Sequence, residues 1–141
     1  MTRKYIGTKE VLAWEQEKDG QPGYSVRYED GYTSWSPKGV FEDAYRVTEG
    51  ASQALNFGDA IHLLKQGKKL ARAGWNGEGM FIFLVPGSTF AVNRPPLLGI
   101  YLEGTTINYH AHIDMRTADG HIVPWLASQT DILASDWACI D

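Results

Sequence analysis

Cysteine is almost missing from this chain of 141 residues, because Cys139 is the only one. A single cysteine excludes an internal disulfide framework, so the fold must be held by its own apolar core. The length allows this, because a domain of this size buries roughly 68–70% of the surface that its unfolded chain exposes. Cys139 lies in a late apolar stretch with no motif around it, and we interpret it as a buried, inert thiol rather than a nucleophile.

Long apolar runs are also missing. No run approaches the about 20 residues that a membrane helix requires, and residues 1–20 lack the apolar core of a secretory signal. Hydrophobic residues make up 43% of the chain and charged residues 21%, which is typical of a globular protein rather than a disordered one. We therefore expect a soluble, cytoplasmic protein with no membrane partner.

The sequence has no excess of positive charge in either half. Its formal net charge is −4, with 13 Lys and Arg against 17 Asp and Glu, and the two signs are mixed along the whole chain. Capture of a nucleic-acid backbone needs a concentrated positive face. The one basic cluster, Lys65 to Arg72, flanks an expected helix end, where cations commonly serve the helix dipole. We therefore expect no DNA or RNA partner, although a small anionic ligand can use one or two of these side chains.

A short run of small and polar residues over 48–54 is the best linker candidate. It separates a front unit of residues 1–50 from a back unit of residues 55–141. In the front unit, turns at Asp19-Gly20 and Asp30-Gly31 predict a β-hairpin with a third short strand. Ser36-Pro37 then predicts a capped helix that covers the sheet with Val40, Phe41, Ala44 and Tyr45. Alone, about fifty residues are marginally stable, so this unit should pack on a neighbour.

The back unit begins with a helix signal, in which Asn56 and Asp59 have the spacing of a capping box. Residues 69–72 and 80–85 predict strands, and the second is apolar enough to be central and covered on both faces. Asp119-Gly120 predicts a hairpin between residues 110–115 and 121–125. Ser128 predicts the cap of a last short helix, with Asp131 as the matching acid. The predicted fold class is α+β, with a mostly antiparallel sheet, short helices and long functional loops.

Three polar side chains alternate along one predicted strand. His110, His112 and Asp114 are two residues apart, so on a strand they share a face, and two imidazoles with a carboxylate are a ligand set that metal ions use. No second ligand cluster supports a metal. An acid–base pair of His112 and Asp114 would need a nucleophile or polarised substrate that the sequence does not reveal. We expect no metal and no cofactor, and keep a metal-dependent or acid–base hydrolase as the alternative.

Trp75 is the sharpest candidate for ligand binding. It stands between Gly74 and Asn76-Gly77, in a loop where a bulky ring must either plug its own sheet or stack on a flat partner. Stacking of a base on an aromatic side chain contributes roughly 1–3 kcal/mol. Asn76 and Asn108 have the donors and acceptors to read the edge of a ring, and Asp114 can accept hydrogen bonds from a ribose diol. From the residues alone, both interpretations of Trp75 stay open.

Over residues 55–140 the sequence resembles the second family of Thoeris anti-defence proteins of bacteriophages. Each matching motif is short, but their order and combination are specific. They are Gly74-Trp75-Asn76-Gly77, Val85-Pro86-Gly87-Ser88, Asn93-Arg94-Pro95-Pro96-Leu97, Asn108-Tyr109, His112-Ile113-Asp114-Met115, Pro124-Trp125, Ser128-Gln129 and Asp136-Trp137. Residues 1–50 depart from this pattern and resemble a separate small phage module of unclear function.

This resemblance implies a function and a set of binding residues. Members of the family sequester, without cleaving them, the cyclic ADP-ribose derivatives that a host Thoeris enzyme makes, and some also hold cyclic oligonucleotides. They form homo-oligomers, typically tetramers, with ligand pockets between subunits. By resemblance, Trp75 stacks on the adenine and either Arg72 or Arg94 contacts the pyrophosphate. The polar contacts would be Asn76, Asn108, Asp114, Ser128 and Asp131.

The leading hypothesis is therefore a non-catalytic sponge for a cyclic nucleotide signal in the cytoplasm of an infected bacterium. Two alternatives from other classes stay open. One is a hydrolase that uses His110, His112 and Asp114, and the other is a structural or regulatory phage protein that binds no small ligand.

Overall fold

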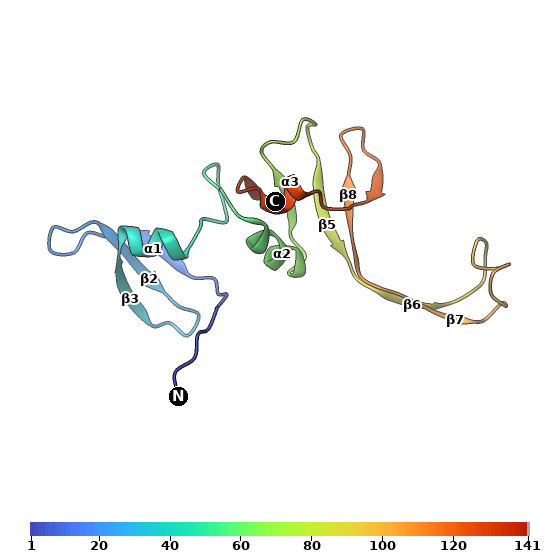
Figure 1. Cartoon of the computed structure of the whole chain (residues 1–141), viewed down its shortest axis with the longest axis horizontal. Helices are drawn as coiled ribbons and strands as arrows, with labels where there is room; N and C mark the ends of the chain where they lie inside the picture. The colour runs from blue at the N-terminus through green and yellow to red at the C-terminus, as the bar shows by residue number, and fades with distance from the viewer. Residues whose placement is uncertain (141) are drawn as a thin grey trace. The chain divides into compact units, whose positions relative to one another are not determined.

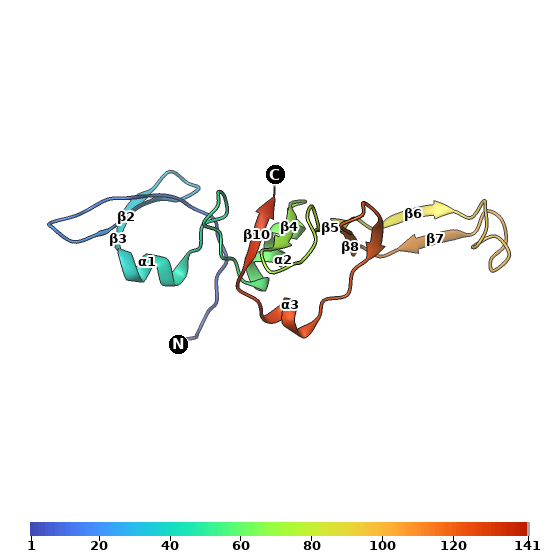
Figure 2. The same cartoon turned by 90° about the horizontal axis from the view of Figure 1, so that it is seen from above.

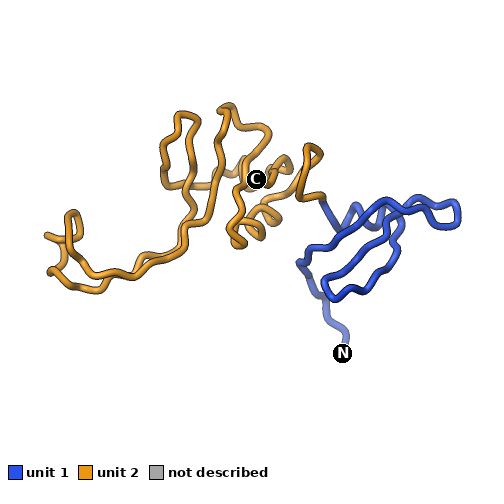
Figure 3. Tube along the Cα trace, turned by 180° about the vertical axis from the view of Figure 1, so that it is seen from behind, with its two compact units in different colours: residues 1–46 blue, residues 47–141 orange. Residues whose placement is uncertain are grey.

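The computed structural model describes residues 1–140. The chain divides into two compact units, Met1–Arg46 (unit 1) and Val47–Asp141 (unit 2), which Figure 3 shows in two colours. The division falls next to the linker expected at residues 48–54. Both units combine antiparallel strands with short helices, which confirms the predicted α+β class.

Unit 1 is a three-stranded antiparallel sheet with a helix on one face. The strands are β1 (Leu12–Glu15), β2 (Gly23–Arg27) and β3 (Thr33–Pro37), in that order, and the helix is α1 (Lys38–Ala44) (Figure 1). Asp19 and Gly20 both have positive φ, 52° and 78°, as the two-residue turn of a hairpin requires. The predicted front hairpin is thus confirmed.

An aromatic stack fixes α1 on the sheet. The ring of Tyr24 lies 4.3 Å from that of Phe41, which lies 4.9 Å from that of Tyr45. Two details of the prediction were wrong. Ser36 does not cap the helix, because the chain is still extended there and its hydroxyl donates to the Pro37 carbonyl. Val40 and Ala44 are exposed, because α1 turns Phe41 toward the sheet instead.

Unit 2 is built on a five-stranded antiparallel sheet in the order β10-β4-β5-β8-β9. Its strands are β4 (Lys69–Arg72), β5 (Phe81–Val85), β8 (His112–Arg116), β9 (Ile122–Pro124) and β10 (Trp137–Ile140). β5 is central, as predicted, and β8 and β9 form the expected hairpin. The expectation that β5 is covered on both faces was wrong, because only its Ile82 is buried.

The core of unit 2 lies between this sheet and α2 (Phe57–Lys65). The helix begins with the predicted capping box: Asn56 accepts from the Asp59 amide, and the Asp59 carboxylate accepts from the Asn56 amide. Its inner face presents Ala60, Leu63 and Leu64 to the sheet. The buried cluster is completed by Leu55, Leu70, Ile82 and Trp137, with Cys139 partly buried against it.

Beyond the sheet, the β5–β8 hairpin continues as a long two-stranded arm (Figures 1 and 2). The arm consists of β6 (Ser88–Ala91) paired with β7 (Thr106–Tyr109) and a tip of residues 92–105, and we call residues 88–109 the arm. Glycine is required where it begins, since a Cβ at Gly87 would lie 2.7 Å from the Tyr109 carbonyl oxygen. The tip contains a cis peptide bond between Pro95 and Pro96. The paired arm was not predicted from the sequence.

The helices of residues 1–140 are all too short or too polar to cross a membrane.

Candidate functional site

The structure brings four of the eight predicted binding residues together. α3 (Gln129–Leu133) begins at Ser128, whose hydroxyl accepts from the Asp131 amide at 3.0 Å. The Asp131 carboxylate then accepts from Arg72 at 2.9 Å and from the indole N–H of Trp75 at 3.2 Å. The predicted cap at Ser128 is therefore confirmed, but the acid of Asp131 points across to β4 and the Trp75 loop.

Asp136 completes this cluster, although the sequence analysis did not select it. Its carboxylate accepts from Arg72 Nε at 2.8 Å and from the Gly74 amide at 2.8 Å. The Arg72 hydrogen bond lowers the pKa of Asp136. Burial raises the pKa of Asp131, but the hydrogen bonds from Arg72, Trp75 and Ser128 outweigh it and the pKa is lowered overall. Both acids are thus held ionised against one guanidinium, whose own pKa they raise.

Trp75 has partners within its own fold. Its ring meets Trp137 edge to face at 5.3 Å, with an interplanar angle of 80°, and it packs against the buried core while staying partly exposed. The hydrogen bonds among Trp75, Arg72 and Asp131 hold α3 against β4, and we call these three residues the clamp. This structural role accounts for all three side chains. A ligand-stacking role for Trp75 stays a prediction.

The other four predicted residues lie apart from this clamp. Asn76 is exposed beside Trp75 in the loop. Asn108 is on the arm and accepts a hydrogen bond from Thr89 at 2.7 Å. Asp114 is in β8 and lies 3.5 Å from His112 Nε2. Arg94 is exposed at the arm's tip.

The histidines do not assemble a metal site within the described chain. Residues 1–140 contain no group of three or more His, Cys, Asp or Glu side chains placed to hold a metal ion. β8 begins at His112, so His110 lies before the strand, although the sequence predicted all three residues on one strand. His121 is near Asp119 instead, at 3.0 Å in the β8–β9 turn.

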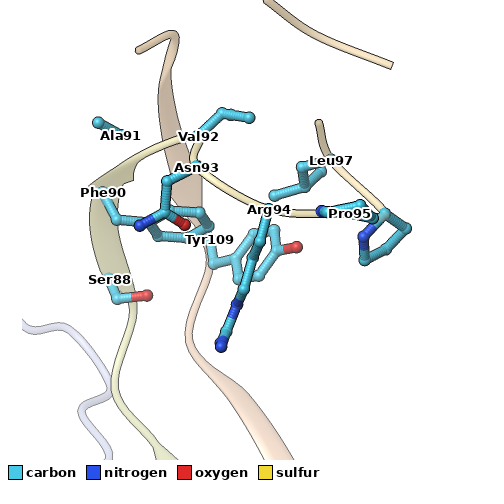
Figure 4. Close-up of a pocket in the computed structure, with 10 residues that line it drawn as sticks. Ser88, Phe90, Ala91, Val92, Asn93, Arg94, Pro95, Leu97 and Tyr109 are labelled. Atoms are coloured by element: carbon cyan, nitrogen blue, oxygen red, sulfur yellow. The ribbon is translucent and has the colours of Figure 1, made fainter. Parts of the chain in front are cut away.

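A recess of about 650 Å³ lies on the arm (Figure 4). Phe90 and Tyr109 meet edge to face at 5.2 Å on one side of the β6–β7 ribbon. The register Ser88↔Tyr109 and Phe90↔Ile107 places both rings on the same face. The tip closes the far end, and from it the Arg94 side chain extends back along the hairpin. The recess is lined by Ser88, Phe90, Ala91, Val92, Asn93, Arg94, Pro95, Pro96, Leu97 and Tyr109.

This arrangement suits a flat, anionic ligand. The volume falls in the range of about 300–1,000 Å³ that small-molecule sites occupy. Two rings offer apolar surface, Asn93 offers an amide, and Arg94 offers a planar fork of donors that matches phosphate oxygens. Of the lining residues, only Arg94 was predicted from the sequence to bind the ligand. Alternating Phe90 and Val92 before the tip, and Ile107 and Tyr109 after it, was the signal that could have revealed the others.

The fold and this recess define an α+β protein with an arginine-lined recess on a projecting hairpin. Comparison with known proteins then identifies its family. The family model described as the Thoeris anti-defense 2-like domain matches residues 55–140. The curated protein "Thoeris anti-defense 2" of Bacillus phage SP01 is 40% identical over 83 residues, which cover 59% of this chain and 91% of that relative. The chain therefore belongs to the Thoeris anti-defense 2-like family, as the sequence motifs predicted, and this membership supports an anti-defence role.

Proposed function

We propose that this protein counters Thoeris defence by sequestering a cyclic ADP-ribose isomer, or a related cyclic nucleotide signal, without converting it. The observation that carries the proposal is the recess on the arm, in which Arg94 and the Phe90–Tyr109 pair face the same space (Figure 4). The rings would hold the adenine, and Arg94 would pair with the pyrophosphate through two parallel hydrogen bonds.

Capture without turnover is the simplest use of these side chains. The recess is lined by apolar side chains, prolines, an amide, a guanidinium and two hydroxyls. Arginine stays protonated, and a serine or tyrosine hydroxyl is a weak nucleophile unless a base activates it. The lining therefore supports binding more than acid–base chemistry.

A second copy of the chain would complete the site. A two-stranded ribbon alone is marginally stable in water, yet nearly every residue of β6 and β7 is exposed. The tip adds exposed apolar side chains, including Ile100 at 71% and Leu102 at 85%. Apolar surface of this kind marks an interaction site. We propose that arms pair in a homo-oligomer, a tetramer by family resemblance, and that pairing closes the recess around the ligand.

The test uses purified full-length protein and cyclic ADP-ribose isomers. The protein is incubated with each isomer, separated from free ligand and heated, and the released material is analysed by mass spectrometry. We expect the intact isomer. A converted product, or dependence on added metal, would instead indicate the hydrolase alternative through His110, His112 and Asp114. If no isomer or cyclic oligonucleotide raises the thermal midpoint, a structural or regulatory protein is favoured.

Variants locate the site. Arg94→Ala should weaken capture about tenfold or more, because a charge-assisted contact is worth about 1.5–3 kcal/mol. Arg116→Ala is a matched control, since this arginine donates to the Gly79 and Thr117 carbonyls away from the recess.

Two aromatic side chains are alternative candidates for stacking on the base, Tyr109 on the arm and Trp75 in the clamp. Tyr109→Ala should weaken capture, whereas Trp75→Phe should leave it unchanged. Loss of capture in a well-folded Trp75→Phe protein would instead identify Trp75 as the residue that stacks on the base, as the family resemblance implied.

A further inference from the structure

The sheet of unit 1 has two unlike faces. Tyr24 and Val26 point toward α1, because Tyr24 stacks on Phe41 and donates to Glu42 at 2.6 Å while Val26 is buried. Strand alternation and the register Trp14↔Ser25↔Trp35 place the opposite set of side chains on the other face. We call this the tryptophan face, which consists of Leu12, Trp14, Gly23, Ser25, Arg27, Thr33, Trp35 and Pro37.

Each tryptophan on this face has a cation over its ring. The Arg27 guanidinium carbon lies 5.6 Å from the Trp14 ring centre, and Lys18 Nζ lies 5.6 Å from that of Trp35. Trp14 stays 42% exposed. Trp35 lies flat over Gly23, where a Cβ would come within 2.4 Å of the ring, and its indole donates to the Gln16 carbonyl at 2.6 Å. Trp14 is thus an exposed ring and Trp35 a partly buried one, and the strand register fixes the positions of both.

The strands also sort their charges between the faces. Arg27 is the charged strand residue of the tryptophan face, and Lys18 reaches it from the β1–β2 turn. The one strand carboxylate, Glu15, is paired with Tyr24 and so belongs to the α1 side. The even mixture of charge along the sequence, which led us to expect no nucleic-acid partner, conceals this separation.

We propose that the tryptophan face binds a short segment of single-stranded nucleic acid. Flat aromatic side chains with cations beside them are how proteins hold unpaired strands, since bases stack on the rings or on guanidinium planes while cations meet the adjoining phosphates. Trp14 and Trp35 are two strands apart, so their Cα atoms are separated by about 9–10 Å. That spacing accommodates a segment of two or three nucleotides. This inference concerns unit 1 and is independent of the proposed capture function of unit 2.

The test is fluorescence anisotropy of the full-length protein with labelled oligothymidylate and oligouridylate of about 15 nucleotides. Two cations predict a slope of about −1.4 for the logarithm of the binding constant against that of salt concentration. Trp14→Ala should weaken binding about fivefold or more, while Trp14→Phe should retain most of it. Arg27→Ala should also make the slope shallower by about 0.7.

Lys9→Ala is the matched control, because Lys9 also sits over a ring, that of Tyr28 at 4.5 Å, but Tyr28 bonds to Ser34 on the α1 side. It should leave oligonucleotide binding unchanged. Circular dichroism confirms that each variant is folded, and capture of cyclic ADP-ribose isomers should be the same in all of them. The proposal is overturned if neither oligonucleotide binds, if Lys9→Ala weakens binding as much as Trp14→Ala does, or if Trp14→Ala only changes the mass of the oligomer. The last result would make the face a protein interface.

Discussion

Arg72 joins segments of unit 2 that are far apart in the sequence. It contacts Asp131 and Asp136, 59 and 64 residues away, and both carboxylates bond to the Trp75 loop as well. Arg72 and Asp131 are largely buried, with side-chain exposures of 14% and 13%. Breaking a pair of this kind costs more than breaking a surface salt bridge, because the remaining charge keeps little solvent. The clamp therefore fixes α3 and the last strand on the sheet.

Asp131→Asn should lower the free energy of unfolding by about 1–3 kcal/mol at pH 7. The pKa of Asp131 is lower in the folded than in the unfolded protein, so its ionised form stabilises the fold. This contribution is present above the unfolded pKa of about 4 and is lost as the pH falls through the folded value. Urea unfolding at pH 7 and pH 3 measures it, and the difference between variant and wild type should shrink in acid.

Glu78→Gln is the control for this experiment, since Glu78 is exposed in the loop after Trp75. It should change stability little at either pH. An equal loss in Asp131→Asn at both values would mean that the charge is not the cause.

The residues of the clamp and the local cap of Ser128 on Asp131 were predictable, but the contacts between distant segments were not. Arg72, Trp75, Ser128 and Asp131 were all selected from the sequence as ligand contacts, Trp75 from its loop and the other three by resemblance, and Ser128 and Asp131 were also predicted as a helix cap. Their mutual hydrogen bonds depend on β4, which brings Arg72 beside β10 and the end of α3. Nothing local encodes that pairing, and Asp136 was missed for the same reason.

At the scale of elements, most local signals were reliable, and the helix cap predicted at Ser36 was the exception. The capping box of α2, the turn at Asp119-Gly120 and the cap of α3 each depend on residues within four positions of one another, and all three were confirmed. The arm was missed because the alternation of Phe90 with Val92 and of Ile107 with Tyr109 is short, and both faces of the paired strands are exposed, so burial does not extend that pattern. Its pairing continues the β5–β8 register instead.

Removing the arm should separate folding from function. Residues 86–111 can be replaced by Asn-Gly, because Val85 and His112 are paired and a two-residue turn fits between them. No residue of the arm belongs to the buried cluster of unit 2, so the thermal midpoint should change little. Light scattering should show a smaller oligomer, and capture of cyclic ADP-ribose isomers should be lost. Unchanged assembly would contradict the proposed role of the arm.

At the scale of the whole molecule, the family match covers residues 55–140 and therefore lies within unit 2. We predict that residues 47–141 alone capture cyclic ADP-ribose isomers with the affinity of the full chain, measured by calorimetry. The physical reason is that this unit has its own core, caps and recess. A fragment that is folded by circular dichroism but fails to capture would mean that residues 1–46 contribute to the site.

Leu55 and Trp137 form an isolated β-bridge. The Leu55 amide donates to the Trp137 carbonyl at 2.9 Å, and the Trp137 amide donates to the Leu55 carbonyl at 3.1 Å. The point where the chain enters the sheet-and-helix body of unit 2 is therefore next to the start of its final strand. A domain whose first and last segments are neighbours tolerates circular permutation and insertion into a loop of another protein. Unit 2 can therefore be joined to different appended domains while its buried core stays intact.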